Sequence, residues 1–409
     1  MTTEINLASP DFKADLYPAF TQTRTEDPVH QVTLAGNRKG WLITRYDDAD
    51  LVLRDPRFVK DVRHALTPEE IAKQFPWQEE QNQAHGAVIS FNRNMLGYDP
   101  PDHTRLRALV NITFTPRLIE QWRNRIQTIA NELLDAVEGK GTMDLIDDFA
   151  FPMPMTVITE MLGVPSDDRG KFRIWSNMVI ESSGNPEDFK QRREQITEFH
   201  EYLVELINQK RRQPADDLLS HLVKVESEGD KLSEKELIAM VFLLLIAGHE
   251  TTVNLIGNGM LALLLHPDQM EKLKQDPSLL KTAIEEFLRF HGPLMTATQR
   301  WAREDLELDG AQISRGDFVL VVLASANHDP SAFTNPEDLD ITRQENRHLA
   351  FGKGIHYCLG APLARLEGQI AISTLLRRLP NLHLTVEPQN LVWRPGALIM
   401  GLRSLPVAF

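Results

Sequence analysis

The chain has 409 residues, of which 42% are hydrophobic and 25% are charged, and this composition is typical of a globular protein. Its 44 Lys and Arg residues against 58 Asp and Glu residues give a net charge of −14, which argues against nucleic acid or an anionic membrane surface as a partner. Its single cysteine, Cys358, excludes an internal disulfide, a multi-cysteine zinc site and a four-cysteine iron–sulfur cluster.

The first hundred residues predict few regular elements. Charged residues such as Glu4 and Lys13 interrupt the first twenty positions, so a secretory signal is not expected and a cytoplasmic location is the default. A short strand is expected at 41–46, because apolar and aromatic residues lie between turn-forming residues. Residues 57–98 read as a loop-rich mixture of short elements.

Apolar residues recur every three or four positions from 116 to 138, which predicts an amphipathic helix. Thr115 is expected to cap its start and Gly139 its end.

A longer helix is expected to begin after Ser233, because Ser233 followed by Glu236 is a capping box ahead of an apolar run. Pro267 should end it, so the helix would be roughly 50 Å long.

A membrane span is the alternative for this helix, because residues 237–248 contain no charged side chain. The run is too short, since spanning takes about twenty apolar residues, and the polar residues His249 and Glu250 follow at once. We therefore predict a buried core helix with a polar cluster at its middle.

Two further short strands are expected, at 318–323 and 382–386. The fold class predicted from these elements is mainly α with small β-sheets. No repeat, low-complexity tract or long linker divides the chain, so a single domain covering residues 1–409 is expected.

The polar cluster at 247–252 contains His249 and Glu250, a pair that also occurs in zinc peptidases. That motif needs a second histidine four residues after the first, so that two ligands share one helix face, but position 253 is Val253. A second alternative is structural, because a threonine hydroxyl at Thr251 can bond to a backbone carbonyl and kink the helix.

The most specific segment is 351–360, which reads Phe-Gly-Lys-Gly-Ile-His-Tyr-Cys-Leu-Gly. Its three glycines let the backbone turn tightly and approach a flat ligand closely. Cys358 stands at the start of a predicted helix, where unpaired N–H groups and the helix dipole favour the thiolate that binds metals. A buried structural cysteine beside a glycine-rich turn is the alternative.

The pattern Phe-x-x-Gly-x-His-x-Cys-x-Gly resembles the haem-binding signature of the cytochromes P450, and every fixed position of that signature is filled. Glu286-x-x-Arg289, followed later by Arg343, resembles the buried Glu–Arg–Arg network of the same family. Alone, an acid and an arginine three residues apart on a helix would be a solvated pair. The matches run in the expected order from Pro100 to beyond Gly360, so the resemblance covers most of the chain.

The resemblance implies a single-domain cytochrome P450 fold, with haem b between the long central helix and the helix that follows the cysteine loop. Cys358 would be the axial ligand of the haem iron. Other residues at family positions would bind the haem, some through its propionates: His103, Arg107, Arg300, His356, Phe351, Gly352 and Gly360. For the nearby Arg105, propionate binding and ordinary surface charge remain equal alternatives.

The implied reaction inserts one atom of dioxygen into a C–H bond or an alkene. Thr251 and Glu250 would manage protons at dioxygen, and Gly248 would open room over the iron. Family positions also imply a mainly apolar substrate pocket, although core packing is the alternative for each member: Ile89, Phe91, Leu244, Ala247, Gly248, Leu294, Met295, Ala297 and Ile399. Steroids, terpenes, macrolide-like rings and fatty acids all remain open as substrates.

The electrons must come from another protein, because the chain shows neither a glycine-rich dinucleotide fingerprint nor a cysteine cluster. We expect NAD(P)H to supply them through a separate reductase with a ferredoxin or flavodoxin. Lys353 and Arg365, together with Arg117 and Arg123, are expected to form a basic docking face, and solvated surface charge is the alternative.

Two other functions remain open. A haem peroxygenase or isomerase would keep the thiolate without activating dioxygen, but such enzymes commonly lack the acid–alcohol pair that Glu250 and Thr251 form here. A non-catalytic haem sensor or carrier would keep Cys358 and need no proton delivery.

Overall fold

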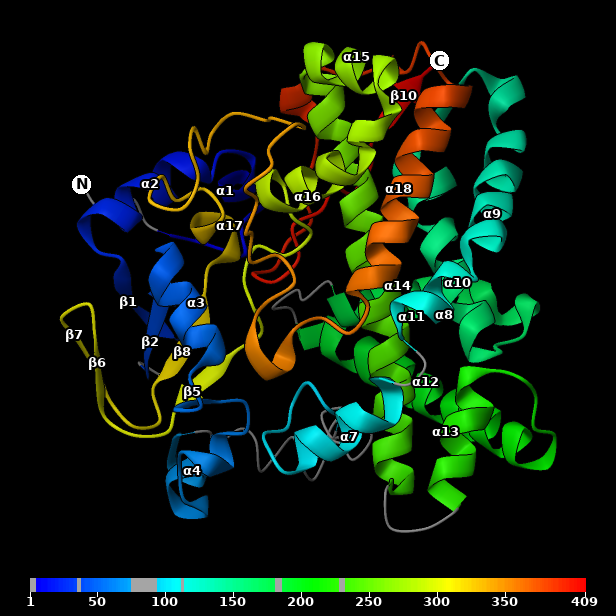
Figure 1. The fold of residues 1–409 in the computed structure, drawn as a ribbon. Helices are drawn as coiled ribbons and strands as arrows, with labels where there is room; N and C mark the ends of the chain where they lie inside the picture. Colours follow the sequence, from blue (N-terminus) through cyan, green and yellow to red (C-terminus); the bar gives the residue numbers. More distant parts are fainter. Residues whose placement is uncertain (1–4, 35–37, 75–93, 112–113, 181–185, 228–231) are drawn as a thin grey trace.

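The structure is a computed structural model that describes residues 5–34, 38–74, 94–111, 114–180, 186–227 and 232–409. It is mainly helical with small sheets, as predicted (Figure 1). The helices are α1 Pro10–Ala14, α2 Tyr17–Glu26, α3 Tyr46–Arg54, α4 Pro68–Gln74, α7 Asp102–Asn111, α8 Pro116–Glu120, α9 Arg123–Asp135, α10 Pro152–Leu162, α11 Arg169–Ile180, α12 Pro186–Arg212, α13 Leu218–Ser227, α14 Glu234–Leu265, α15 Pro267–Gln275, α16 Leu280–Phe290, α17 Leu323–Ala326 and α18 Ala361–Arg378.

The predicted long helix is α14, and it runs through the middle of the molecule with α18 beside it (Figure 1). Ser233 caps its start, and both halves of the capping box with Glu236 are formed. The helix ends at Leu265, just before Pro267, as expected, and Pro267 begins α15. Among the described residues α14 is long and apolar enough to cross a membrane, but 67% of its most apolar window is buried inside the protein. It is therefore the core helix that the sequence predicted.

The predicted helix over 116–138 is wrong in detail, because it divides into α8 and α9 at Gln121 and Trp122. Both pieces pack on α18, and the break lets the chain change direction between them. Thr115 caps α8, as predicted. Gly139 does not end α9, which stops at Asp135, and it is Gly141 that adopts the left-handed conformation.

The strands form one five-stranded sheet in the order β1-β2-β8-β5-β3, a three-stranded sheet in the order β4-β10-β9, and the hairpin β6-β7. In the five-stranded sheet β2 and β8 are parallel and the other pairs are antiparallel. Their bounds are β1 Val29–Leu34, β2 Arg38–Ile43, β3 Phe58–Val59, β4 Thr142–Asp144, β5 Arg300–Ala302, β6 Leu306–Leu308, β7 Ala311–Ile313, β8 Phe318–Val321, β9 His383–Leu384 and β10 Pro406–Ala408.

All three predicted strands exist but are displaced or shorter than expected. The expected strand at 41–46 is β2, which ends at Ile43, and Tyr46 already begins α3. The strand at 318–323 ends at Val321, because the chain turns into α17 at Leu323. The strand at 382–386 is reduced to β9.

Most buried apolar residues belong to one core cluster, which extends from Leu7 to Val407 and surrounds α14. A smaller cluster lies against the five-stranded sheet and includes Trp41 and Val319. Part of the predicted loop-rich stretch at 57–98 is regular, since β3 and α4 fall within it, and residues 75–93 lie outside the described part.

Candidate active site

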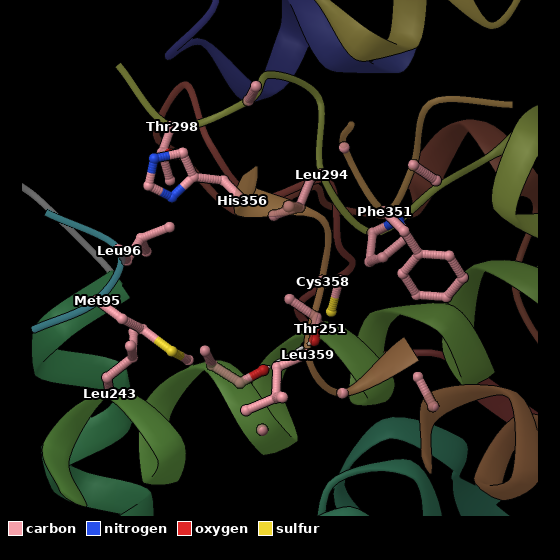
Figure 2. A pocket seen from close by; sticks show the side chains of 18 of the residues that line it. Met95, Leu96, Leu243, Thr251, Leu294, Thr298, Phe351, His356, Cys358 and Leu359 are labelled. Carbon is pink, nitrogen blue, oxygen red and sulfur yellow. Dashed lines mark hydrogen bonds between the residues drawn. The ribbon is translucent and has the colours of Figure 1, made fainter. Parts of the chain in front are cut away.

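One cavity collects most of the sequence-predicted site residues, and Figure 2 shows Cys358 and Thr251 on its wall. Its walls come from α14, from the segment that ends in Cys358, from the segment before β5 and from α7. Leu363 and Ala364 of α18 also line it, so the cavity lies between α14 and α18. Apolar side chains dominate the wall: Met95, Leu96, Phe114, Ile158, Leu243, Leu244, Ala247, Leu294 and Ala297.

The backbone of the cysteine loop depends on glycine at two positions. Gly352 and Gly354 both have φ +67°, in the left-handed region that other residues rarely adopt. A Cβ atom on Gly354 would also lie 3.0 Å from the Leu53 carbonyl oxygen. The Cys358 N–H donates to the Phe351 carbonyl oxygen at 2.9 Å, which closes the loop. The sequence therefore folds this segment into a tight cradle ahead of α18.

Opposing effects act on the Cys358 sulfur. Burial raises the pKa of the thiol, while the N–H groups of Gly360 and Ala361 and the charges of Arg107 and Arg365 lower it by smaller amounts. The helix start therefore favours the thiolate, as predicted, but burial outweighs it in the protein alone. A bound metal cation would supply the missing stabilisation of the negative sulfur.

One end of the cavity is crowded with cations and imidazoles. The rings of His103 and His356 lie 4.4 Å apart, centroid to centroid, and Arg300 and Arg107 line the same wall. Both ring nitrogens of His103, Nε2 of His356 and Nε of Arg300 are buried without a hydrogen-bond partner among the described residues. Buried polar atoms are rarely left unpaired, so this end is suited to an acceptor-rich ligand.

The electrostatics at the cationic end of the cavity favour a negatively charged ligand. Burial, followed by the positive charges of Lys60, His103, Arg300 and Arg107, lowers the pKa of His356 to about 2. Burial also lowers the pKa of Arg300 to about 10. The two carboxylates of a haem would satisfy the unpaired donors and offset the excess positive charge. Together with a cavity-facing thiol on a glycine-rich loop, these residues fit haem.

Thr251 lies on the cavity wall, and its hydroxyl donates to the Ala247 carbonyl oxygen at 2.9 Å. This is the structural bond that the sequence offered as an alternative, and it leaves the hydroxyl oxygen free to accept. Gly248 also lines the cavity, but a Cβ atom there would lie 3.0 Å from Ile158 on α10. The glycine therefore permits close packing of α10 on α14 as well as room in the cavity.

Glu250 is not on the cavity wall, although the sequence paired it with Thr251. Its Oε2 lies 3.4 Å from the Ser176 hydroxyl and 3.5 Å from His249 Nε2, and its Oε1 lies 3.5 Å from Arg394 Nη1. Consecutive residues on a helix point about 100° apart, and here that rotation turns the carboxylate away from the cavity.

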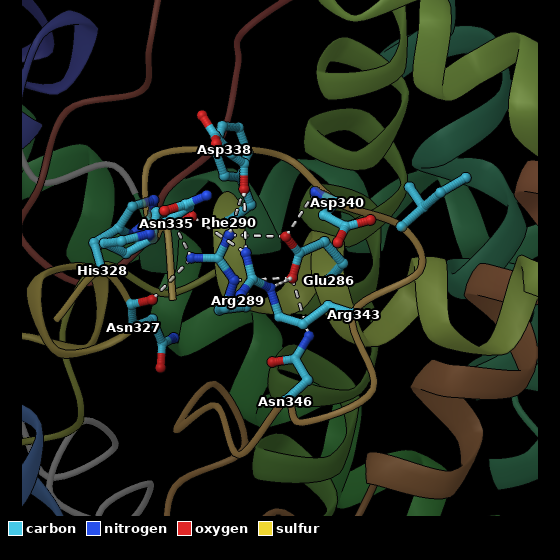
Figure 3. A network of polar contacts seen from close by, with 12 residues as sticks. Glu286, Arg289, Phe290, Asn327, His328, Asn335, Asp338, Asp340, Arg343 and Asn346 are labelled. Atoms are coloured by element: carbon cyan, nitrogen blue, oxygen red, sulfur yellow. Dashed lines mark hydrogen bonds and ion pairs between the residues drawn. The ribbon is translucent and has the colours of Figure 1, made fainter. Parts of the chain in front are cut away.

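The three residues of the predicted Glu–Arg–Arg network meet in one buried cluster (Figure 3). Arg289 donates to both oxygens of Glu286 at 2.8 Å, and Arg343 Nε donates to Oε2 at 3.1 Å. Arg289 also donates to the carbonyl oxygen of Asn327 at 3.1 Å, and the Asn327 amide oxygen accepts from the Leu349 N–H at 2.7 Å. The cluster is thus joined to the start of the cysteine loop.

The structure brings five of the nine predicted substrate-pocket residues to the cavity. Leu244, Ala247, Gly248, Leu294 and Ala297 line the cavity. Two other members do not: Met295 is fully buried in the core, and Ile399 pairs with Leu294 through a β-bridge. Neighbouring residues of an extended segment point to opposite sides, so Met295 faces away from the cavity that Leu294 lines. Ile89 and Phe91 lie outside the described residues.

Several lining residues were missed. Leu243 could have been found, because positions 243, 247 and 251 share one face of α14. Met95, Leu96 and Ile158 carried no sequence signal, since their positions depend on how distant elements pack.

Two of the four cations in the predicted basic docking face are paired with acids. Arg365 donates to both oxygens of Glu285, at 2.6 and 2.8 Å, and Arg123 is paired with Glu120. Lys353 lines the cavity, and Arg117 is exposed.

Arg105, for which propionate binding and ordinary surface charge were equal alternatives, does not line the cavity. It is paired with Glu236 at 2.5 Å and with Asp102 at 2.9 Å.

Comparison with known proteins gives a consistent result. The family model described as Cytochrome P450 matches residues 51–394. The chain is 46% identical over 407 residues to a cytochrome P450 of Bacillus subtilis (strain 168), covering 100% of this chain and 97% of that one. It is 47% identical to the cytochrome P450 monooxygenase PikC of Streptomyces venezuelae, covering 97% and 92%. The crystal structure of myxobacterial cytochrome P450 CYP267B1 with myristic acid superposes with TM-score 0.91 at 43% identity, covering 98% of both chains.

Proposed function

The chain belongs to the cytochrome P450 family, and we propose a role in its haem-thiolate monooxygenase chemistry for each polar group of the cavity. The reaction inserts one atom of dioxygen into a C–H bond or alkene of a mainly apolar small molecule, with electrons from a separate redox partner. The roles of these residues are proposed from the cavity. Cys358 and Thr251 face the same space in it, and buried donors without a partner among the described residues lie at one end.

When bound, haem supplies the iron at which dioxygen is reduced and split. Cys358 would hold the iron through its sulfur, which the N–H groups of Gly360 and Ala361 support as the anion. His103, Arg107, Arg300 and His356 would hold the two propionates, supported by the unpaired donors and excess positive charge at that end. Phe351, Gly352 and Gly360 would shape the loop against the haem face.

Thr251 is the proposed proton-handling group on the cavity wall. Its hydroxyl hydrogen is directed to the Ala247 carbonyl oxygen, and this bond fixes the orientation of the hydroxyl. The hydroxyl oxygen then accepts a hydrogen bond from a group in the cavity. Proton delivery by Glu250 requires that carboxylate to turn from the side of Arg394 towards the cavity. The Glu250 side chain is buried and lies 3.4–3.5 Å from Ser176, His249 and Arg394, so this rotation would break those contacts.

The proposed substrate is an aliphatic molecule of the fatty-acid or polyketide type. The wall beyond the cationic end is formed by Met95, Leu243, Leu244 and Ile158, which offer shape and apolar contact rather than charge. Related proteins fit this class by name: one was solved with myristic acid, one is the polyketide biosynthesis cytochrome P450 PksS of Bacillus subtilis (strain 168), and one is the 6-deoxyerythronolide B hydroxylase of Saccharopolyspora erythraea.

The proposed electron donor is a ferredoxin or flavodoxin that receives electrons from NAD(P)H through a reductase in the cytoplasm. Ile355 and Tyr357, next to Cys358, are 52% and 39% exposed and offer an apolar contact. Lys353 and Arg117 are the predicted cations without an acidic partner in the described part of the chain. Exchanging both for Glu should slow reduction by an acidic donor at low salt but not at high salt. Equal rates at low salt would contradict this docking face.

We also propose that residues 1–409 form one domain. The support is the core cluster around α14, which takes members from Leu7 near one end of the chain to Val407 near the other.

Turnover with isotopically labelled dioxygen tests the proposed chemistry. The haem-loaded protein, a ferredoxin with its reductase, NADPH and a fatty acid that shifts the ferric spin state should give product with one labelled oxygen atom. Label-free product that forms only with added peroxide would indicate a peroxygenase. Ligand binding without product from any oxidant would indicate a sensor or carrier.

A further inference from the structure

A second ionic network lies beside the Glu–Arg–Arg cluster and is centred on Glu285. Arg365 of α18 donates to both carboxylate oxygens of Glu285, through Nε at 2.6 Å and Nη2 at 2.8 Å. His348 Nε2 lies 3.1 Å from Glu285 Oε2. The network is partly buried, because the side chain of His348 is 4% exposed and those of Arg365 and Glu285 are 31% and 29% exposed.

The groups of this network surround the cysteine loop from both ends. Before the loop, the Ala350 N–H donates to His348 Nδ1 at 3.2 Å. The proton of the His348 ring is therefore on Nε2, which donates a hydrogen bond to Glu285. On the leaving side, Arg365 Nη1 donates to the Tyr357 hydroxyl at 3.3 Å.

The flat face of the guanidinium is also engaged. The Arg365 guanidinium carbon lies 4.5 Å from the centroid of the Phe351 ring, within the range of a cation–π contact. One side chain after the loop therefore touches both the first residue of the loop and the neighbour of Cys358.

We propose that Glu285, Arg365 and His348 form a clamp that positions the Cys358 loop, and that Arg365 is its central positioning residue. The inference rests on the proposed role of Cys358 as the haem ligand. Glu285 and Glu286 are neighbours on α16: Glu286 fixes the segment around 338–346, and Glu285 fixes the loop itself. The charge of Arg365 also favours an ionised Cys358 sulfur.

The clamp is suited to hold its geometry across the neutral pH range. Burial alone would raise the pKa of Glu285, but hydrogen bonds from Arg365 and His348 lower it to about 2. The carboxylate therefore stays ionised well below neutral pH.

Arginine is needed in this position because lysine cannot make two parallel bonds to a carboxylate and stack on a ring at the same time. The substitution Arg365→Lys thus keeps the charge and removes the geometry.

The test follows the stability of the iron–thiolate bond in haem-loaded full-length protein. We would prepare Arg365→Lys, Arg365→Gln and Glu285→Gln. The matched control is Arg378→Gln, because Arg378 also lies on α18 and is paired with two acids, Asp135 and Glu138, away from the loop. After reduction under carbon monoxide, the Soret band of the thiolate complex and that of the thiolate-free complex are followed in moderate urea.

Arg365→Gln and Glu285→Gln should lose the thiolate band about tenfold faster than wild type, since weakening one charged hydrogen bond changes a rate by that order. Arg365→Lys should fall between them and wild type, and Arg378→Gln should match wild type. Equal rates in all four variants, with normal haem content, would overturn the clamp.

Two further outcomes distinguish a failed clamp from a failed haem-ligand assignment and from a loss of folding. A wild-type protein without a thiolate band would contradict the proposed function itself rather than the clamp. If a Gln variant fails to fold, Arg365→Lys and His348→Gln carry the test, and an unchanged rate in both would also overturn it. A reduction potential that shifts with Arg365→Gln but not with Arg378→Gln would support an effect on the haem ligand beyond general stability.

Discussion

The buried acid Glu367 offers a quantitative test of the packing between α14 and α18. Its side chain is 1% exposed, and neither carboxylate oxygen has a hydrogen-bond partner within the standard distance among the described residues. Burial raises its pKa from 4.5 to about 8, although the nearby Thr252 hydroxyl opposes the shift. Glu367 is therefore a neutral acid at pH 7 in the folded protein and an ionised one in the unfolded chain.

The sign of the pH effect follows from this difference. Because the folded state keeps a proton that the unfolded state releases, Glu367 reduces stability as pH rises from about 4.5 to about 8, with no further change above that. Each pH unit costs about 1.4 kcal/mol, so the total is at most about 5 kcal/mol. Glu367→Gln removes the titrating group and should remove this penalty.

Urea unfolding of haem-loaded protein, followed by far-ultraviolet circular dichroism at pH 5.5, 6.5 and 7.5, measures the effect. The unfolding free energy of Glu367→Gln minus that of wild type should grow by about 3 kcal/mol across this range. Glu201→Gln, at an exposed position, is the control and should show no such trend. A difference that stays constant, or that shrinks as pH rises, would refute the buried neutral carboxyl.

Three other predictions concern the site. Glu286→Gln leaves Arg289 buried without its counter-charge, so unfolding free energy should fall by about 3–5 kcal/mol, and urea titration of wild type and variant checks this. Thr251→Ala should divert electrons from product to peroxide while Thr251→Ser restores product, and coupled product in the Ala variant would contradict the assigned role. Gly354→Ala should lower haem retention and reduce the unfolding free energy by about 1–3 kcal/mol, since alanine is strained at positive φ and its Cβ would crowd Leu53. The haem content that remains after dialysis against apomyoglobin measures the loss of retention.

The parts of the fold that the sequence predicted depend on local signals. The capping box at Ser233 uses residues three apart, so it could be read directly, and it correctly marked the start of α14. The cysteine loop could be recognised because Gly352 and Gly354 must adopt conformations that other residues avoid. Glu286 and Arg289 share a helix face, and the sequence order then pointed to Arg343 as their third member.

The parts that could not be predicted depend on distant packing. The direction of Glu250 is set by Arg394, which is far away in the chain, and helix periodicity alone cannot tell which face of α14 meets it. Arg365 resembled a surface cation because its partner Glu285 lies on another helix. The break between α8 and α9 reflects how both pieces pack on α18, and no proline or glycine marks it.

The spectrum of the reduced protein under carbon monoxide tests the central claim most directly, because it reports which atom holds the iron. Wild type and Cys358→His should be compared after haem loading. We expect a thiolate-type Soret band for wild type and its loss in Cys358→His, with haem still held by the residues at the cationic end. The same band in both proteins would show that Cys358 is not the ligand and would contradict the haem-thiolate assignment.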